Sequence, residues 1–387
     1  MTKSLSDSER IDWIQLIRTQ NIGPVSFFRL IKKFGTASNA LEMLPEFSRQ
    51  SGRKTPLIPF KRADAEREAK HAWNKGVQIL AACEPEYPMP LRAIADPPPV
   101  IFLRGAVNLF EKKAVAIIGA RNASGNGQKF ARELAQRLGE EDIVIVSGLA
   151  RGIDGAAHTA SLKTGTIAVV AGGIDYIYPP EHDELTRMIA NQGLILSERP
   201  LGAEPTARDF PRRNRLISGL CSGVVIVEAA TKSGTLITAR YALEQGREVF
   251  AVPGSPLDPR CRGANRLLRD GANWAESAED ILQALAEQNR ALFEEDRDLD
   301  RLEDLFGDLK DKNHDFIGGL THENEADLMS LRDEIYQFLG FTPIHRDEIL
   351  RSIQAPPSYI ADALLALTLG GDIEETSGGM FARRDCD

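Results

Sequence analysis

The stretch Ala114–Gly127, AVAIIGARNASGNG, is the segment that decides the fold of this chain. Its first five residues are all apolar, which is typical of a strand buried on both faces of a parallel sheet. A loop rich in glycine follows at once, and glycine lets backbone approach a ligand closely. A helix that begins after such a loop favours anions at its amino terminus. The stretch therefore predicts a buried strand that ends in an anion-binding loop.

The same pattern recurs in five later segments that lie between residues 143 and 254. Helical stretches separate short apolar runs, and this alternation predicts a doubly wound α/β domain with a parallel sheet over residues 76–290. The runs are IVIVSGL (143–149), TIAVVAGG (166–173), LILSE (194–198), GVVIVEA (223–229) and EVFAVPG (248–254).

The segments on either side of this domain have other patterns. Residues 1–75 carry apolar residues at helical spacing and predict a small helical domain. Residues 294–311 hold nine Asp or Glu against three Lys or Arg, so we expect an acidic linker over 291–325. Three helices and a hairpin around Gly378 and Gly379 are predicted for 326–387, which is a winged-helix pattern.

Composition limits the classes of function. The net charge of the 387 residues is -9, which argues against a uniformly basic protein but permits a local basic groove. The four cysteines show no C-x-x-C pair, so we expect reduced thiols and no zinc site. With neither a signal peptide nor a long apolar run, a cytoplasmic protein without a membrane span is expected.

Cationic and hydroxyl side chains gather where the predicted strands end. Carboxyl ends of parallel strands meet at one edge of a sheet, so these loops predict a surface for phosphate oxygens. The segment DFPRRNRLISGL, Asp209–Leu220, adds an arginine cluster that we expect at the same edge. The residues concerned are Arg121, Ser124, Ser147, Arg151, Arg212, Arg213, Arg215, Lys232, Ser233, Thr235 and Ser255.

Sequence motifs do not identify a nucleotide or a metal. Neither the dinucleotide fingerprint nor a P-loop occurs, and no nucleophile is paired with a base. His158 is expected to satisfy local hydrogen bonds, and Asp154 is expected to cap the helix that contains it. Tyr176 and Tyr178 either stack on bases or pack against the sheet.

Four long motifs resemble the DNA-processing protein A family (DprA, also called Smf). They are YPMPLRAIADPPPVIFLRG (87–105), SGLARGIDGAAHTASL (147–162), FPRRNRLISGL (210–220) and EAATKSGTLITARYALEQGREVFAVPG (228–254), and the resemblance runs from about Val77 to Leu285. It implies an extended Rossmann domain that forms a homodimer and has neither a cofactor nor a catalytic activity. It also implies binding of single-stranded DNA without sequence preference. The strand is handed to the RecA recombinase, and inhibition by single-strand binding protein is relieved, during natural transformation.

The resemblance also implies a set of DNA-contacting positions in four segments. Ala120 stands where a serine is common in the family, which puts a hydroxyl contact there in doubt. The positions are Gly119, Ala120 and Arg121; Ser147, Gly148 and Arg151; Arg213, Asn214 and Arg215; and Lys232, Ser233 and Gly234.

Alternatives stay open for both flanking domains and for the function. The turn at NIGP, with Asn21 and Gly23, resembles one helix-hairpin-helix unit that either binds DNA or is structural or regulatory. The predicted recognition helix of the winged helix has one charged residue, Asp362, which favours a structural role or a protein partner. KSGTLITA is similar to a loop of phosphoribohydrolases, so a nucleotide-processing hydrolase is the rival function, although Glu244 lies far from that loop. A scaffold without DNA binding or turnover is the third reading.

Overall fold

The computed structural model describes residues 3–50, 57–288, 325–376 and 379–384. It divides into two compact units, residues 1–280 and 281–387. The acidic segment expected at 291–325 lies outside the described residues up to position 324.

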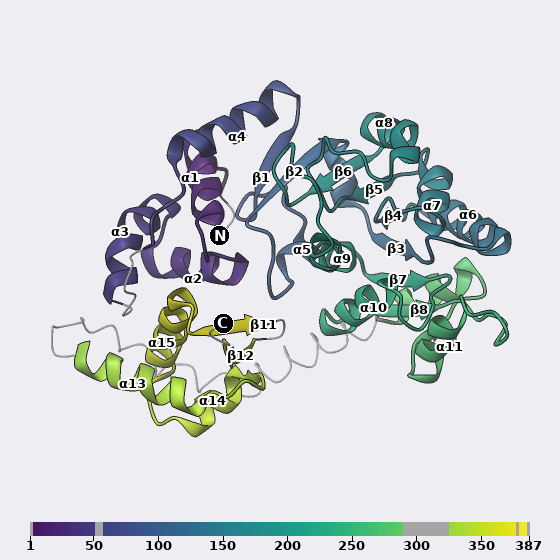
Figure 1. Ribbon diagram of the computed structural model, residues 1–387. Coiled ribbons are helices and arrows are strands. Elements are labelled where there is room, and N and C mark those ends of the chain that lie inside the picture. The colour runs from purple at the N-terminus through teal and green to yellow at the C-terminus, as the bar shows by residue number, and fades with distance from the viewer. Residues whose placement is uncertain (1–2, 51–56, 289–324, 377–378, 385–387) are drawn as a thin grey trace, which may run out of the picture. The chain divides into compact units, whose positions relative to one another are not determined.

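Among the described residues of the first unit, nine strands form one sheet in the order β1-β2-β6-β5-β4-β3-β7-β8-β9 (Figure 1). Strands from β6 to β9 along this order are parallel, whereas β2 pairs antiparallel with both β1 and β6. The predicted parallel strands are thus confirmed. The strands are β1 Gln78–Ala81, β2 Val100–Gly105, β3 Ala114–Ile118, β4 Val144–Ser147, β5 Thr166–Val169, β6 Leu194–Ser197, β7 Gly223–Ile226, β8 Glu248–Ala251 and β9 Asn273–Trp274.

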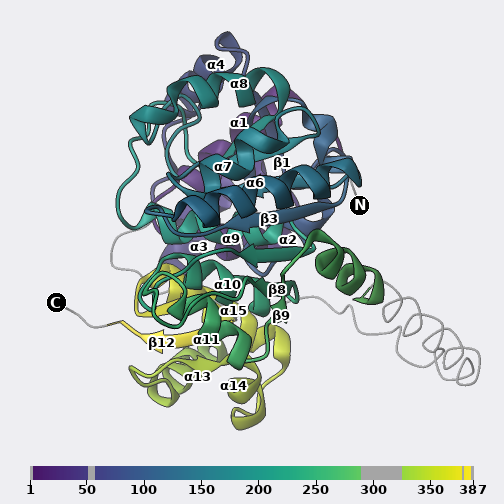
Figure 2. The ribbon, with the colours of Figure 1, turned by 90° about the vertical axis from the view of Figure 1, so that its right-hand side faces the viewer.

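Helices cover both faces of this sheet (Figures 1 and 2). The helices α6, α7 and α8 lie on one face, and α9 and α10 lie on the other. The order of strands reverses between β3 and β7, which makes their carboxyl ends the topological switch point, where ligands bind in open α/β sheets. The elements are α5 Met89–Arg92, η1 Val107–Glu111, α6 Gly125–Glu140, α7 Ile153–Ser161, η2 Pro180–His182, α8 Asp183–Gln192, α9 Asp209–Gly219, α10 Thr235–Glu244 and α11 Arg262–Arg269.

The amino-terminal helices form a small bundle beside strand β1 (Figure 1). Trp13 packs against Phe27 with ring centroids 4.8 Å apart, and Phe28 completes this aromatic cluster. Asn21 adopts a left-handed φ of 64°, as expected for the hairpin turn, whereas Gly23 is extended. The helices are α1 Asp7–Arg18, α2 Pro24–Phe34, α3 Ala37–Gln50 and α4 Arg62–Asn74.

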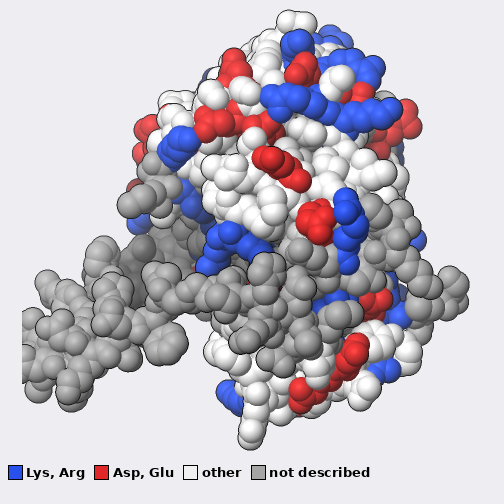
Figure 3. Space-filling model, turned by 90° about the vertical axis from the view of Figure 1, so that its left-hand side faces the viewer, with Lys and Arg blue, Asp and Glu red and all other residues white. Residues whose placement is uncertain are grey.

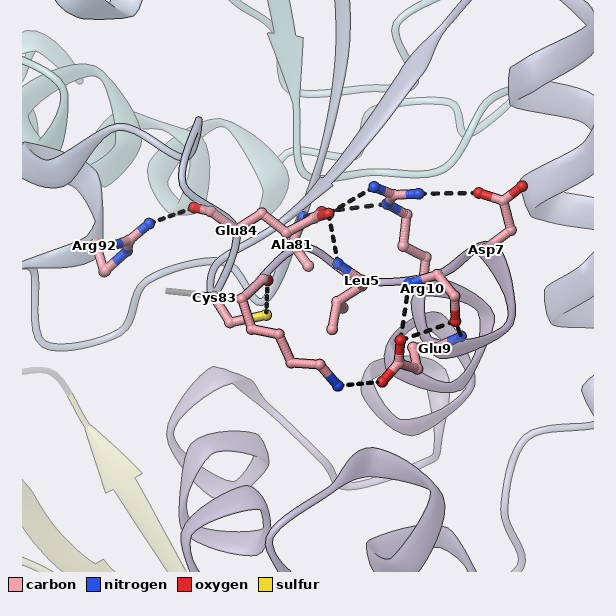
Figure 4. Close-up of polar contacts among 10 residues, drawn as sticks. Leu5, Asp7, Glu9, Arg10, Ala81, Cys83, Glu84 and Arg92 are labelled. Atoms are coloured by element: carbon pink, nitrogen blue, oxygen red, sulfur yellow. Dashed lines mark hydrogen bonds and ion pairs between the residues drawn. The ribbon is translucent and has the colours of Figure 1, made fainter. Parts of the chain in front are cut away.

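A buried carboxylate fixes this bundle to the sheet edge (Figure 4). Glu84 is only 1% exposed and accepts hydrogen bonds from the amides of Leu5 and Ala81, at 3.1 and 2.8 Å. The guanidinium of Arg10 donates two more, at 2.6 and 3.3 Å. A buried charge is stable only when it is paired in this way. Glu84 therefore fixes the start of α1 to the turn after β1.

The second unit contains a three-stranded sheet in the order β10-β12-β11, packed on helices. The hairpin expected near Gly379 is the β11–β12 pair, and its core is built on Ile335, Leu364 and Phe381. Its elements are α13 Glu325–Phe338, β10 Ile344–His345, α14 Arg346–Ser352, α15 Pro357–Gly370, β11 Ile373–Thr376 and β12 Met380–Arg383. The middle of α15 is buried, so this helix, whose one charged residue is Asp362, packs in the core of the unit.

Candidate functional site

Loops from three neighbouring strands are joined at the carboxyl edge of the sheet. The amide of Ile153, after β4, donates to the carbonyl of Ala120, after β3, at 3.3 Å. The hydroxyl of Thr235, at the start of α10, donates to the carbonyl of Gly119 at 3.3 Å. Gly152 has φ of 74°, and a Cβ there would collide with the carbonyl of Ala120, so only glycine fits this junction. The loops consequently form one continuous rim.

The rim exposes cations from three different loops. Arg121, Arg151 and Lys232 are all exposed to solvent. Arg151 pairs with Glu181 at 2.6 Å, but both side chains are more than half exposed, and such pairs contribute little. In the described part of the chain, Arg121 and Lys232 have no ion pair. Both of these cations therefore remain available to an anionic ligand.

Aromatic rings stand beside these cations. The guanidinium of Arg121 lies over the ring of Phe210, 5.3 Å from its centroid, and Phe210 packs against Tyr178 at 5.5 Å. A cleft of about 300 Å³ is lined by Arg121, Asn122, Ala150, Arg151, Tyr178 and Pro179. A narrower pocket beside it includes Tyr176, Tyr178 and Phe210.

Phe210 is a site residue that the sequence analysis missed. It stands directly before the arginine cluster in FPRRNR, and that position was the available signal. Tyr178 is exposed and packs against Phe210, so its ring is accessible to a ligand, and its stacking on bases stays a prediction.

Arg213 is buried beneath the rim instead of lying on it. It is 7% exposed, and its Nη1 donates to the carbonyl of Gly148 at 2.7 Å and to that of Val169. Burial lowers the pKa of its guanidinium to about 10, against the attraction of Asp154, which raises it. Arg213 thus ties the loop after β4 to the end of β5.

Asp154 has a different role from the helix cap that the sequence suggested. Helix α7 begins at Ile153 with Gly152 as its cap residue. The Asp154 carboxylate instead accepts from the amides of Gly148 and Ala150, at 3.1 and 3.3 Å. Burial raises its pKa, while Arg213 and these amides oppose the rise. Asp154 therefore holds the loop after β4 in place through the amides of that loop.

Arg215 is directed to another part of the domain. It is 6% exposed and pairs with Asp96 at 3.0 Å and with Glu198 at 2.7 Å. The guanidinium was expected on the rim, but it is paired with these two carboxylates inside the domain. Helical spacing does not explain this, because Arg212 and Arg215 are three residues apart and share one side of α9. Arg212 is exposed, whereas the two carboxylates hold Arg215 inside the domain.

The other expected positions divide between surface and interior. Ser147 is buried, and its hydroxyl donates to the carbonyl of Ile117 at 2.7 Å. Asn214 is half-buried and donates to the carbonyl of Gly234 at 3.4 Å, which brings α9 to the loop before α10. The structure gathers at the rim surface Ala120, Arg121, Arg151, Asn214, Lys232, Ser233 and Gly234, and it buries Gly119, Gly148 and the side chains of Ser147, Arg213 and Arg215.

The buried histidine is held neutral. His158 is fully buried, its Nδ1 lies 2.7 Å from the hydroxyl of Thr166, and burial lowers its pKa to about 3. The contact with Thr166 is a local hydrogen bond of the kind that the sequence analysis expected, and burial removes the imidazole from solvent. No group of three potential metal ligands is present among the described residues, and none of the helices in that part of the chain has the length and apolar character needed to cross a membrane.

The amino-terminal bundle carries charges of both signs. On the face shown in Figure 3, Lys and Arg are intermixed with Asp and Glu. Arg62 and Arg67 of α4 pair with Asp12 and Asp64, respectively. The cations of this helix are thus largely matched by acids, in contrast to those of the rim.

Comparison with known families matches all three parts of the chain. The family described as DNA recombination-mediator protein A matches residues 78–286. The DprA-like N-terminal HHH domain matches residues 7–70, and the DprA winged helix domain matches residues 321–379.

Individual relatives agree with these matches. DNA processing protein DprA of Bacillus subtilis is 45% identical over 56% of this chain and 74% of its own length. Protein Smf of Synechocystis is 36% identical over 73% of this chain and 74% of its own length. The X-ray structure of DNA processing protein A from Streptococcus pneumoniae superposes with a TM-score of 0.60 and 33% identity, covering 73% of this chain and 98% of that one. DNA processing protein A from Helicobacter pylori, whose structure concerns a single-stranded DNA binding mode, gives a TM-score of 0.51 and 30% identity, covering 55% of this chain and 96% of that one.

Proposed function

Because the chain belongs to the DprA family of DNA recombination-mediator proteins, we propose that its rim binds single-stranded DNA without sequence preference. The bound strand is then transferred to a RecA recombinase during natural transformation, with relief of inhibition by single-strand binding protein. A homodimer formed through the Rossmann domain belongs to the same proposal. The single-stranded DNA binding mode described for the Helicobacter pylori relative supports the first step.

The observation that carries this proposal is the placement of Arg121, which lines the cleft, over the ring of Phe210. Arginine donates paired hydrogen bonds to phosphate oxygens. Aromatic rings stack on bases of any sequence, and single-strand binding combines both contacts. The side chains of Arg121 and Phe210 supply this combination at one place.

We assign three roles to the residues around the rim. Arg121, Arg151 and Lys232 contact phosphates through their exposed side chains, and Phe210 and Tyr178 stack on bases. The loops at Gly119–Ala120 and Ser233–Gly234, with Asn214, present polar backbone and amide groups. Burial removes the side chains of Ser147, Arg213 and Arg215 from direct contact, and we give these residues positioning or structural roles.

The rival function, a nucleotide-processing hydrolase, lacks support in this geometry. Glu244 is the last residue of α10 and pairs with Arg240, whereas the segment KSGTLITA that suggested the hydrolase ends at Ala239, in the first half of that helix. His158 and Asp154 are buried under the rim. The DNA-binding interpretation is therefore preferred.

The test is a binding titration with a fluorescent oligothymidylate, an oligonucleotide of mixed sequence and a duplex of equal length. We expect similar affinities for the two single strands and a weaker one for the duplex. The logarithm of the affinity should fall with the logarithm of salt concentration by about 0.7 for each phosphate held. Loading is tested by RecA-promoted strand exchange on DNA precoated with single-strand binding protein. Preference for the duplex would contradict the proposal.

A further inference from the structure

The amino terminus of α6 is where this type of sheet ordinarily receives a phosphate. The helix follows β3 at the switch point, and backbone amides at such a terminus attract anions. Ser124 caps α6, and its hydroxyl accepts a hydrogen bond from the amide of Gly127 at 2.9 Å. This terminus lies directly behind Arg121, only three residues further along the chain.

A carboxylate of the protein already occupies that position. Glu228 follows β7 and is 5% exposed. Its Oε2 accepts from the amide of Ser124 at 3.0 Å, and its Oε1 accepts from the Ser124 hydroxyl at 2.5 Å. A Cβ on Gly127 would lie 2.6 Å from Glu228 Oε1, so the carboxylate rests against the first turn of α6.

We propose that Glu228 is a specificity-determining residue, an internal anion that closes the α6 terminus to free phosphate and to the terminal phosphate of a mononucleotide. A ligand phosphate would have to displace a buried carboxylate from the amide and hydroxyl of Ser124. It would also meet a like charge at close range, which is strongly unfavourable. Anions are thereby limited to the outward-facing cations of the rim.

The consequence concerns ligand class. A mononucleotide has one terminal phosphate group and depends on a single deep site, whereas a polynucleotide distributes many phosphates along a surface. With the α6 terminus closed, only a polynucleotide, which contacts several cations of the rim at once, binds tightly. This inference refines the proposed function by naming free phosphate and mononucleotides as ligands that the site excludes. The closure of the α6 terminus by Glu228 does not itself depend on DNA binding.

The experiment uses Glu228→Ala, with Glu181→Ala as the matched control. Glu181 is an exposed carboxylate on the same rim, paired with Arg151, so its removal changes the net charge equally without opening the α6 terminus. Binding of inorganic phosphate is measured by calorimetry in a phosphate-free buffer at constant ionic strength. We expect phosphate affinity to rise at least about tenfold in Glu228→Ala and to stay near the wild-type value in Glu181→Ala.

Equal gains in both variants, or no gain in either, would overturn the proposal. If Glu228→Ala is unfolded without phosphate, circular dichroism during phosphate addition becomes the readout. Recovery of the native spectrum with phosphate but not with chloride supports the closure of the α6 terminus by Glu228, and failure to recover contradicts it.

Single-stranded DNA affinity is measured on the same wild-type sample. A wild-type protein that does not bind DNA would refute the proposed function, while the phosphate comparison would still decide the role of Glu228.

Discussion

The guanidinium of Arg213 donates to the carbonyl oxygen of Gly148 at 2.7 Å, so a buried cation from α9 supports the loop that follows β4. Val169 provides a second carbonyl, and Asp154 supplies the nearby negative charge. One arginine of the cluster thus ties the loop from which Arg151 projects to the end of β5.

Removing this guanidinium should destabilise the domain. Arg213→Ala leaves the buried Asp154 carboxylate without its compensating charge, and we expect a loss of about 3 kcal/mol in the free energy of unfolding. Urea denaturation followed by circular dichroism measures the loss. Adding Asp154→Asn to the same protein should restore part of it. A single-variant loss below about 1 kcal/mol would show that Arg213 is not a structural support.

Arg215 should separate stability from DNA binding. Arg215→Gln leaves Asp96 and Glu198 without their shared cation, so unfolding should occur at lower urea concentration. Because the guanidinium does not face the rim, the salt dependence of DNA binding by the folded variant should match the wild type. Fluorescence anisotropy across a salt series makes the measurement. A flatter salt dependence would place Arg215 in contact with phosphate after all.

Charge reversal at the rim should weaken DNA binding and leave stability nearly unchanged, whereas Arg215→Gln should lower stability and leave DNA binding unchanged. Arg121→Glu and Lys232→Glu should each weaken binding of every oligonucleotide by about tenfold or more and reduce the salt slope by about 0.7. Their effect on stability should be small because both side chains are exposed.

Lys163→Glu is the matched control for these reversals. Lys163 is exposed between α7 and β5, at the opposite edge of the sheet. Equal losses in all three variants would indicate a general charge effect and would remove the rim from the binding site.

Stability should fall in acid through His158. Burial and the nearby positive charges of His182 and Arg213 lower the pKa of His158 from 6.5 to about 3. Between these values the unfolded chain binds a proton that the folded chain does not. The free energy of unfolding is therefore not reduced by His158 above the unfolded pKa. It falls as the pH drops below that value, by up to about 1.4 kcal/mol for each pH unit.

The control for this effect is His158→Gln. Urea unfolding of both proteins is compared between about pH 7.5 and about pH 5, and the wild type should lose more stability than the variant. Asp154, whose pKa is raised by burial, is common to both proteins, so its effect largely cancels in the comparison. Parallel pH profiles would mean that His158 is not the titrating group.

Strand pairing shows where sequence patterns were informative. The six apolar runs, from AVAIIGA to EVFAVPG, became β3 to β8 because short, continuously apolar segments suit strands that are covered on both faces of a sheet. Strands β1 and β2 were not predicted: β2 lies within the proline-rich motif of residues 87–105, β1 is a four-residue segment before it, and both pair antiparallel at the sheet edge. Their place depends on partners distant in sequence.

The sequence by itself determined that cationic, glycine-containing loops end neighbouring parallel strands, since strand direction brings those ends to one edge. Only the tertiary structure decided which arginine of FPRRNR reaches that edge. On one helix, Arg212 faces solvent, Arg213 lies under the loop at Gly148, and Arg215 meets Asp96 and Glu198. The choice follows from packing of α9 against segments tens of residues away, and local spacing contains no record of those partners.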